Sequence, residues 1–394
     1  MNNAHQIPGS LSLDFFTEED LRAEKKARKK FRLNVIGVGA MGQEHIWTAL
    51  KIGSAEINGI YDPNKKSIES CAKWFGDFSR VVKYPSLEDA VLDPGIDGLI
   101  IATPNFHHVE AMRTARLSTK PILLEKPMAS NLRDAWEIVE MAKNRPAPVQ
   151  VALEYRQKAV YLEAFDHLKR RKSIGDPLMV QITEHRAPFL HKVNQWNKFS
   201  EYSGGTLVEK CCHYFDLFNL CAGPEGQATR VYASGGMAVN FKDFEFRGKK
   251  SDIIDHAFVT VEYSSGMRAC LNLCMFSYGA GAAEEMIING TEGRIKAVDV
   301  PREHLSVWRK GAHPSLECGV AFPPHVATTG NHGGSTWLEH EIFYRLLAGE
   351  KADFPTVIDG FQSVLVGVAA EESIKSGKPV DTATLLAATQ TRPY

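Results

Sequence analysis

The stretch NVIGVGAMGQEH, residues 34–45, decides how the first part of this 394-residue chain must fold. An apolar run leads directly into Gly37, Gly39 and Gly42, and a helical pattern begins at the end of this run. Such a glycine pattern is a weak signal alone, but between a strand and a helix it matches a dinucleotide-binding fingerprint. Gly37 permits a tight turn, Gly39 lets the backbone approach a pyrophosphate, and Gly42 allows close packing of the helix.

The helix that follows this turn presents its free N–H groups and the positive end of its dipole to the phosphates. The first predicted cofactor contacts are therefore Gly37, Val38, Gly39, Ala40, Met41 and Gly42. A glycine-rich turn without a ligand is the alternative.

The next apolar run ends INGIYDP and places Asp62 about twenty residues past the glycines, where a carboxylate can hydrogen-bond both ribose hydroxyls. This position favours NAD over NADP. Lys65 and Lys66 follow closely and can serve a 2′-phosphate, and Asp62 can also be a turn former at a strand end. We expect NAD as the cofactor, with NADP as the less favoured alternative.

The pattern of apolar runs changes near residue 150. Before it, short runs alternate with helical stretches, which predicts a parallel sheet covered by helices. After it, longer runs broken by SSG, NG and TEG turns predict antiparallel hairpins, residues 303–335 form an irregular loop, and helical spacing returns at 335–349 and 356–377.

We therefore predict an α/β protein with an N-terminal, doubly wound parallel sheet and a C-terminal α+β domain with a large, mostly antiparallel sheet. The predicted parts are an N-terminal helical extension (1–30), a nucleotide-binding domain (31–150), a substrate and oligomerisation domain (151–335) and a C-terminal helical return (336–394).

Composition excludes several classes of partner. Lys and Arg (46) balance Asp and Glu (47), so neither nucleic acid nor an anionic membrane is expected to bind. The apolar runs are too short to span a bilayer and the first residues lack a secretory signal, so we expect a cytoplasmic protein. Of the seven cysteines, Cys211 and Cys212 are adjacent, which fits buried reduced thiols; a zinc site with His213 and Cys221 is the weaker alternative, and no metal is expected.

Two segments supply candidates at the edge of the sheet that should carry the nicotinamide. In LLEKPM, Glu125 and Lys126 emerge from an apolar run, and partial desolvation is expected to lower the pKa of Lys126 and fit it for proton work. A surface ion pair between the two is the alternative. GLIIATPNFHH ends a strand at the same edge, and its candidate cofactor contacts are Thr103, Pro104, Asn105 and His108, with a helix-capping role for Asn105 also open.

The stretch GGTLVEKCCHYFDL, residues 204–217, is apolar enough to be buried yet contains Glu209 and His213. If a helix follows Gly205, these two lie one turn apart on the same face and can point at one substrate. Buried ionisable groups are costly unless they are paired or used, so a catalytic site or a structural Glu–His pair explains them. Lys210 and Asp216 are expected to pair with groups of the other domain.

The stretch EHRAPFLHKVNQWNKF, residues 184–199, mixes aromatic and hydrogen-bonding side chains in a way that suits a sugar ring. Its cations also suit an anionic substituent, although an ordinary polar loop is an alternative. The candidate substrate contacts here are Arg186, His191, Lys192 and Trp196.

Together GVGAMG, the strand ending in Asp62, ATPNFHH, EKP, EYRQ and GGTLVEKCCHYFDL resemble the Gfo/Idh/MocA family of glucose-fructose oxidoreductase and inositol 2-dehydrogenase. The resemblance implies a Rossmann domain and an open-faced sheet that carries the sugar and often mediates dimers or tetramers. It implies Lys126 as the catalytic lysine and Glu209 with His213 as the carboxylate and histidine, although Asp is more usual than Glu209. Tyr155 and Arg156 match the aromatic-Arg dipeptide that opens the second domain.

From these residues we expect an NAD-dependent dehydrogenase of a sugar, polyol or glycoside. His213 would take the hydroxyl proton, Lys126 would polarise the oxygen, and Glu209 would orient His213 or bind a neighbouring hydroxyl. Tyr155 would stack on the sugar and Arg156 would support the site. The alternatives are an NAD-dependent glycosidase, which needs a further acid or base such as Tyr155, Glu209 or a histidine of the 313–332 loop, and a non-catalytic dinucleotide sensor.

Overall fold

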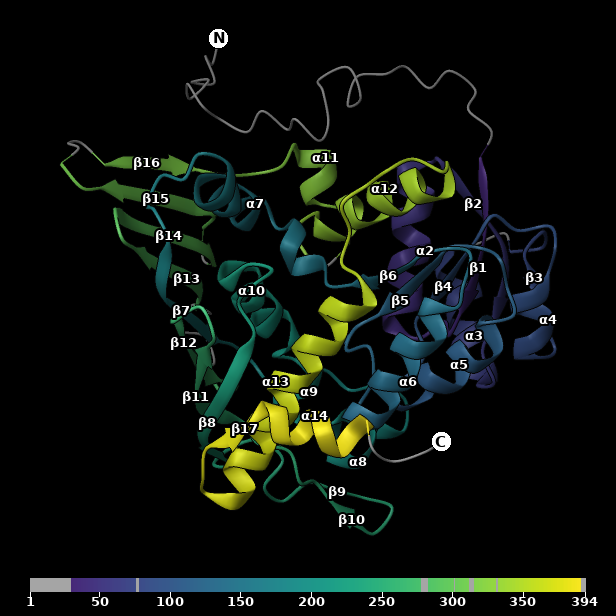
Figure 1. The fold of residues 1–394 in the computed structure, drawn as a ribbon. Helices are drawn as coiled ribbons and strands as arrows, with labels where there is room; N and C mark the ends of the chain where they lie inside the picture. The colour runs from purple at the N-terminus through teal and green to yellow at the C-terminus, as the bar shows by residue number, and fades with distance from the viewer. Residues whose placement is uncertain are drawn as a thin grey trace.

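The computed structural model describes residues 30–75, 78–277, 283–300, 302–311, 315–330 and 332–390. Two sheets lie on opposite sides of the molecule, with a layer of helices between them (Figure 1). The predicted helical extension at residues 1–30 falls almost entirely outside the described residues. No helix in the described ranges is both long and apolar enough to cross a membrane.

The first sheet has six parallel strands in the order β3-β2-β1-β4-β5-β6, which is a doubly wound topology. Its strands are β1 (Phe31–Ile36), β2 (Ala55–Tyr61), β3 (Val82–Lys83), β4 (Gly98–Ile101), β5 (Ile122–Glu125) and β6 (Val149–Ala152). Its helices are α2 (Ala40–Ile52), α3 (Lys65–Phe75), α4 (Leu87–Leu92), η1 (Asn105–His107), α5 (His108–Ala115) and α6 (Leu132–Lys143).

Both faces of this sheet are buried, because the central strands β1, β4 and β5 are almost continuously apolar. One core lies under α4, α5 and α6, and another under α2 and α12 (Ser335–Leu347). The C-terminal part of the chain thus completes the first domain.

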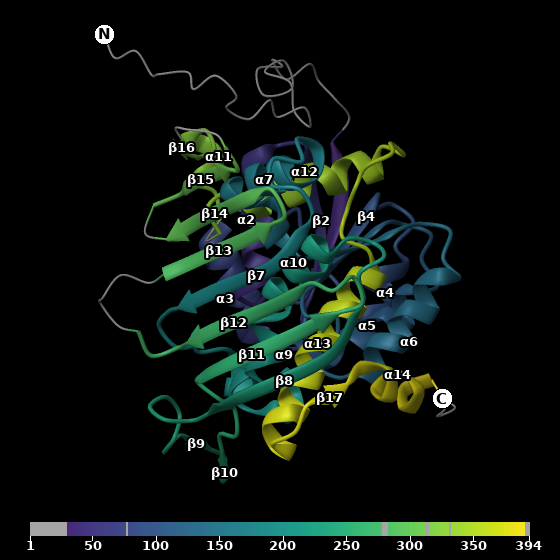
Figure 2. The same ribbon diagram turned by 60° about the vertical axis from the view of Figure 1, so that its left-hand side comes forward.

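The second sheet has nine strands in the order β16-β15-β14-β13-β7-β12-β11-β8-β17 (Figure 2). Its strands are β7 (Pro177–His185), β8 (Ala228–Gly236), β11 (His256–Tyr263), β12 (Arg268–Cys274), β13 (Ala283–Gly290), β14 (Gly293–Val300), β15 (His304–Arg309), β16 (Leu316–Gly319) and β17 (Val380–Asp381). All pairs are antiparallel except β7 with β12. The predicted fold class, a doubly wound domain followed by a largely antiparallel α+β domain, is confirmed.

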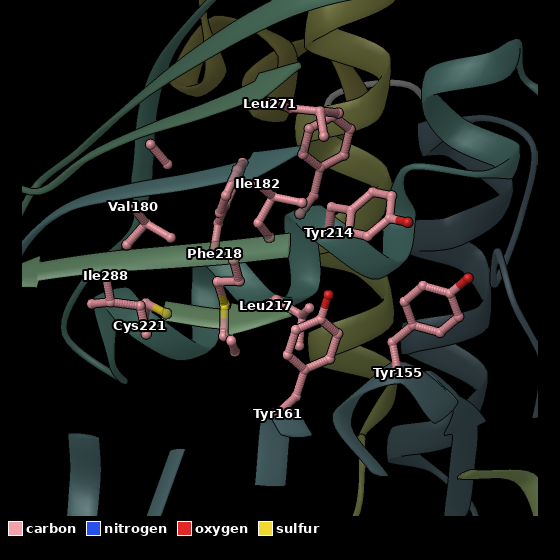
Figure 3. Close-up of a cluster of buried hydrophobic side chains, with 14 of the residues drawn as sticks. Tyr155, Tyr161, Val180, Ile182, Tyr214, Leu217, Phe218, Cys221, Leu271 and Ile288 are labelled. Atoms are coloured by element: carbon pink, nitrogen blue, oxygen red, sulfur yellow. The ribbon is translucent and has the colours of Figure 1, made fainter. Parts of the chain in front are cut away.

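One face of this sheet packs against helices that lie between the two sheets (Figure 1). The helices and short elements of this part are η2 (Glu154–Gln157), α7 (Ala159–Phe165), η3 (Asp166–Arg170), η4 (Val193–Lys198), α8 (Ser200–Ser203), α9 (Thr206–Glu209), α10 (Cys212–Ala222), β9 (Glu245–Phe246), β10 (Lys249–Lys250), α11 (Pro324–Ala327), α13 (Val357–Ser376) and α14 (Thr382–Gln390). Figure 3 shows the core, in which Phe218 and Leu217 of α10 pack near Val180 and Ile288 of the sheet.

Two expectations about local structure are wrong. Residues 303–335 are not simply an irregular loop, because Leu305 and Val307 alternate with more polar residues and bury one face of strand β15. The segment after Gly205 is not one helix: α9 ends at Glu209 and α10 starts at Cys212, so the helix is interrupted between the two predicted site residues.

The Gly204-Gly205 turn sets where α9 begins. Both glycines have positive φ angles, of 85° and 90°, which other residues rarely adopt. A Cβ on Gly205 would lie 2.3 Å from Oε1 of Glu371, which accepts a hydrogen bond of 2.9 Å from the backbone N–H of Leu207. Helix α13 thus holds the start of α9, and with it the position of Glu209.

We expect Gly205→Ala to destabilise the protein more than Gly266→Ala. Gly266 has a similar φ of 88°, but no atom lies within 4 Å of the place that an added methyl group would take, so it reports the backbone strain alone. That strain costs about 1 kcal/mol, and the clash with Glu371 should add about 1–2 kcal/mol at Gly205. Equal losses of unfolding free energy in denaturant titrations would contradict this account of the turn.

Candidate functional site

A cavity of about 570 Å³ lies at the carboxyl ends of strands β1, β2, β4 and β5, where a doubly wound sheet binds its ligand. Its far wall comes from the second domain. The lining residues include Gly37, Gly39, Ala40, Met41, Asp62, Thr103, Pro104, Asn105, Phe106, His107, Glu125, Lys126, His191, Lys192 and Trp196. The cavity thus brings residues of both predicted sets, cofactor and substrate, around one space.

The fingerprint glycines each have a geometric reason. Gly37 has a φ of 85° and donates to the carbonyl of Tyr61 at 2.8 Å, and a Cβ there would meet the backbone of Ala102. A Cβ on Gly42 would lie 2.0 Å from the Gly37 carbonyl, so α2 can approach the turn only with glycine. Gly39, at the N-cap of α2, has open space where its side chain would be.

Asp62 holds the glycine turn and faces the cavity. Its Oδ2 accepts from the N–H of Val38 at 3.0 Å and its Oδ1 from the N–H of Asn64 at 2.8 Å. Burial raises the pKa of Asp62, and the two backbone hydrogen bonds partly offset this effect. Each oxygen keeps a lone pair for a hydroxyl. Together with the open Gly39 and the free N–H groups of α2, this geometry fits an adenine dinucleotide.

The wall after β4 differs from prediction at one residue. Thr103, Pro104 and Asn105 line the cavity, and the buried Thr103 hydroxyl has no partner among the described residues. The amide of Asn105 donates to the carbonyl of Ser203, so it joins the domains and does not cap a helix. His108 does not line the cavity: it is fully buried and its ring nitrogens contact the carbonyls of Pro127 and Thr103.

Glu125 and Lys126 leave β5 in different directions. Oε1 of Glu125 pairs with His45 at 2.9 Å and its Oε2 accepts from the backbone N–H of Lys126 at 3.0 Å. Burial opposes ionisation of Glu125, but His45 and Lys126 hold its pKa below the ordinary value. Glu125 is therefore an anchor beneath Lys126 and not part of a surface ion pair.

The expectation that desolvation lowers the pKa of Lys126 is wrong. Burial does disfavour the ammonium, but the negative charges of Glu209, Glu154 and Glu125 outweigh it and raise the pKa of Lys126. Its Nζ also lies 3.4 Å from the carbonyl of Glu209. Lys126 therefore stays a cation, suited to holding an oxygen but not to removing a proton.

Glu209 is buried and pairs with the substrate loop, residues 184–199, which contains the candidate substrate contacts. Its Oε1 accepts from Nζ of Lys192 at 3.1 Å. Burial alone would raise its pKa, yet Lys192 and Lys126 lower the pKa of Glu209 to about 2. The Glu209 carboxylate pairs with Lys192 and makes no hydrogen bond or ion pair with His213 within the described part of the chain, so the predicted orienting role is not seen.

His213 is 2% exposed and does not line the cavity. Its Nε2 lies 3.5 Å from Oε1 of Glu154, and its ring stacks on Tyr155 with centroids 4.0 Å apart and planes 9° apart. Burial and the nearby charges of Lys126 and Lys210 lower the pKa of His213 well below its usual value, so the ring is neutral. The effect of Lys126 shows that the two predicted catalytic groups lie within electrostatic reach.

Tyr155 cannot stack on a sugar in this arrangement, because both ring faces are covered. His213 covers one face, and the Lys158 ammonium lies 3.7 Å from the ring centroid. The Tyr155 hydroxyl accepts from Nζ of Lys210. Burial raises the pKa of Tyr155, while the two lysines lower it in part. In Figure 3 its hydroxyl lies away from the aliphatic part of the core.

Arg156 joins elements and does not face the substrate. Its guanidinium donates to both oxygens of Asp216 and, at 2.8 Å, to Asp359 at the start of α13. Asp216 and Lys210 are paired, but with groups of their own domain and not of the other domain as predicted: Asp216 with Arg156, and Lys210 with Glu184 at 3.4 Å. The predicted substrate-binding role of Arg156 is not seen, since Arg156 does not line the cavity and its Nε and Nη2 donate to carboxylates.

The substrate loop is divided between the cavity and the interior. His191, Lys192 and Trp196 line the cavity, and Nζ of Lys192 lies 4.6 Å from the centre of the Trp196 ring. His191 contacts Gln195. Arg186 does not line the cavity; it donates to the carbonyl of Ala187 and lies 3.7 Å from Glu184.

Sequence reasoning missed several site residues. Phe106 and His107 line the cavity beside Trp196. The Phe106 and Trp196 rings are arranged edge-on, with their centroids 6.3 Å apart. Glu154 had a usable signal, since it follows the apolar run of β6 much as Glu125 ends β5. His332 was among the histidines of the 313–332 loop named as a further acid or base, but its approach to Glu154, at 3.8 Å, could not be predicted because it depends on how α12 packs.

Two models of one oxidoreductase family match the chain: an NAD-binding Rossmann fold over residues 31–153 and a C-terminal alpha/beta domain over residues 170–382. The chain belongs to the Gfo/Idh/MocA family. The resemblance predicted from the motifs is thereby confirmed, and the first domain is an NAD-binding domain of an oxidoreductase.

Relatives match this chain over most of their length. Inositol 2-dehydrogenase 1 of Saccharopolyspora erythraea is 33% identical over 355 residues, covering 89% of this chain and 96% of that protein. The scyllo-inositol 2-dehydrogenase (NAD(+)) of Bacillus subtilis (strain 168) is 27% identical over 358 residues, which cover 89% of this chain and 95% of that protein. A levoglucosan dehydrogenase solved with NADH and levoglucosan covers 90% of this chain and 100% of its own at a TM-score of 0.77 and 20% identity, a likeness of fold.

We expect Glu209→Gln to remove part of the acid sensitivity of the fold. The pKa of Glu209 is about 2, below its usual 4.5, so its ionised form stabilises the protein above that usual value. This contribution is lost as the pH falls toward 2. The difference in unfolding free energy between wild type and variant should shrink by on the order of 3 kcal/mol across this range.

Denaturant titrations at stepped pH measure this difference. Glu69→Gln, on an exposed position of α3, is the matched control and should run parallel to wild type. A constant difference between wild type and Glu209→Gln would show that Glu209 is not held ionised by its lysines.

Proposed function

We propose that this protein is an NAD-dependent dehydrogenase that oxidises a secondary hydroxyl of a cyclic polyol or sugar. The observation that carries the proposal is the position of Lys126, whose pKa is raised by neighbouring carboxylates, at the end of β5 and inside the cavity that also contains the dinucleotide fingerprint. The inositol dehydrogenase relatives support a polyol or sugar as substrate.

The chain's own residues would divide the work as follows. Gly39, Ala40 and Asp62 bind the dinucleotide, whose nicotinamide supplies the oxidant when bound. Lys126 holds the substrate oxygen and favours its developing negative charge. His213 is neutral but does not line the cavity, so it can take the hydroxyl proton only where the substrate reaches its Nδ1, which has no partner among the described residues. Glu209 fixes Lys126 and Lys192 by charge, while Trp196 offers an apolar face to the ring.

The geometry favours a neutral substrate over an anionic one. Lys192 is paired with Glu209, and Arg186 lies beside Glu184, so the cations of this loop are already balanced by carboxylates. An acidic sugar would have to compete with these pairs. We propose a neutral ring that donates and accepts hydrogen bonds at Lys192 and His191.

The redox-neutral glycosidase is the second candidate because of one observation. Such a cycle needs a further acid or base, and the buried Glu154 carboxylate has no hydrogen-bond partner among the described residues. Its reaction would release an aglycone and return the cofactor to its starting state.

We further propose a homo-oligomer, a dimer or tetramer, in which the outer face of the nine-stranded sheet is covered. Met179 and Phe258, on strands β7 and β11, are 61% and 63% exposed, which is unusual for large apolar side chains. Light scattering of the purified protein measures the number of subunits.

The function is tested by mixing the purified protein and NAD⁺ with inositols, neutral sugars, acidic sugars and aryl glycosides. We expect NADH to accumulate with a neutral cyclic polyol or sugar.

Lys126→Ala should lower kcat by about a thousandfold, because an oxyanion-type donor is lost, yet leave NAD⁺ binding within about threefold. Aglycone release without NADH would favour the glycosidase, and an active Lys126→Ala would remove this lysine from the scheme.

We expect Asp62 to set the preference for NAD. Asp62→Asn keeps one oxygen for the backbone of Val38 but removes the charge that repels a 2′-phosphate. The ratio of the Kd for NADP⁺ to the Kd for NAD⁺ should fall by about tenfold, measured by calorimetric titration. Glu69→Gln on the exposed face of α3 controls for loss of a charge outside the cavity, and an unchanged ratio in Asp62→Asn would assign the preference elsewhere.

A further inference from the structure

Glu154 is a buried carboxyl group that has no part in the dehydrogenase reaction described above beyond its charge effect on Lys126. It begins η2 directly after strand β6 and is 2% exposed. Neither carboxylate oxygen has a hydrogen-bond partner among the described residues. A buried carboxylate without hydrogen-bond partners costs several kcal/mol, so its retention points to a use.

Two histidines from distant parts of the chain flank Glu154. Nε2 of His213, on α10, lies 3.5 Å from its Oε1, and Nε2 of His332, just before α12, lies 3.8 Å from the same oxygen. The other ring nitrogen of His332 contacts Oε1 of Glu44 at 2.9 Å, which fixes the ring. Glu44 in turn accepts from the Thr336 hydroxyl at 3.0 Å.

This series runs from the interior to solvent. The side chain of His213 is 2% exposed, that of Glu154 is 3% exposed, and that of His332 is 26% exposed. Contacts of 3.5 and 3.8 Å are longer than hydrogen bonds, but catalytic hydrogen bonds are commonly long before the substrate binds and shorten in its complex.

We propose that Glu154 and His332 carry the substrate's hydroxyl proton from His213 to solvent, an inference that rests on the dehydrogenase function proposed above. In the neutral ring, a proton on Nε2 faces Glu154, which leaves Nδ1 as the acceptor; Nδ1 has no partner among the described residues. When Nδ1 receives the hydroxyl proton, Nε2 releases its own to a Glu154 oxygen, and Glu154 passes one to His332.

The step balances within the proposed reaction. The O–H bond breaks and its electron pair forms the second bond of the carbonyl, while the hydrogen and electron pair of the C–H bond go to the bound NAD⁺. One proton per turnover then leaves His332 for water. No further oxidant is needed, and His213, left with its proton on Nδ1, regains its starting tautomer by proton exchange after the product leaves.

The surrounding charges favour this direction of transfer. His213 faces Lys126, Lys210, His332 and Lys158, which together with burial disfavour an imidazolium there. Burial and the charge of Glu125 raise the pKa of Glu154, and they outweigh the charges of His332 and Lys126, which lower it. At His332, burial and the charge of Lys126 lower the pKa. The hydrogen bond to Glu44 and the charges of Glu154 and Glu44 outweigh both effects, so the pKa of His332 is raised.

The test compares Glu154→Gln and His332→Ala with two matched controls. Glu339→Gln changes another buried carboxyl near Glu154, whose pKa burial raises well above its usual value, so burial disfavours its charged form. His325→Ala changes an exposed histidine on α11. NADH formation and proton release are followed together in weak buffer with a pH indicator.

We expect Glu154→Gln to lower kcat by about a hundredfold with an unchanged Kd for NAD⁺. His332→Ala should lose about tenfold and regain most of it with added imidazole, because its position reaches solvent. Both controls should match wild type. Wild-type turnover in Glu154→Gln, or a loss in His332→Ala that imidazole does not restore, would overturn the relay.

A measurement without turnover separates this inference from the proposed function. The ring of His332 is titrated by NMR in the NAD⁺-bound protein, and its pKa should fall in Glu154→Gln but not in Glu339→Gln. If the wild type oxidises none of the substrates, the dehydrogenase proposal fails while this shift still tests the coupling. An unchanged His332 pKa in Glu154→Gln would overturn the inference by itself.

Discussion

The charge balance around Lys126 is the constraint on which the rest of the site depends. An ammonium at the end of a buried strand would lose its proton if burial acted alone. It stays charged because three carboxylates surround it, and each comes from a different element: Glu125 from β5, Glu154 from η2 and Glu209 from α9. The charge of Lys126 therefore depends on Glu154 and Glu209 of the second domain as well as on Glu125 of its own.

The same requirement explains the costly polar groups in GGTLVEKCCHYFDL. Lys210 and Asp216 are satisfied by Glu184, Tyr155 and Arg156, and these pairs hold α10 against η2 and the nine-stranded sheet. Because Arg156 also reaches Asp359 of α13, one guanidinium joins three segments. The polar groups of this stretch thus fix the domain junction, and Glu209 and His213 are positioned by it.

Much of the fold could be predicted because its signals are local. The six strands of the first sheet were legible as apolar runs at regular intervals, and the glycines 37, 39 and 42 belong to a single strand–turn–helix unit. The break between α9 and α10 was not predictable, since no glycine or proline lies between Glu209 and Cys212 to mark it. Strand β15 was missed because its short alternation lies within a Gly- and Pro-rich segment.

The sequence by itself determined the family, the fold class and the cavity wall formed by the glycine turn, Asp62 and Lys126, because these depend on residue spacing along one chain segment. Only the tertiary structure decided which charges meet. It covered both faces of Tyr155, assigned Arg156 to carboxylates, kept Lys126 protonated, and placed His332 beside Glu154 from a distant segment of the chain. The reason is physical: the pKa of a buried group is set by desolvation and by charges a few ångströms away, and folding brings these charges from distant segments.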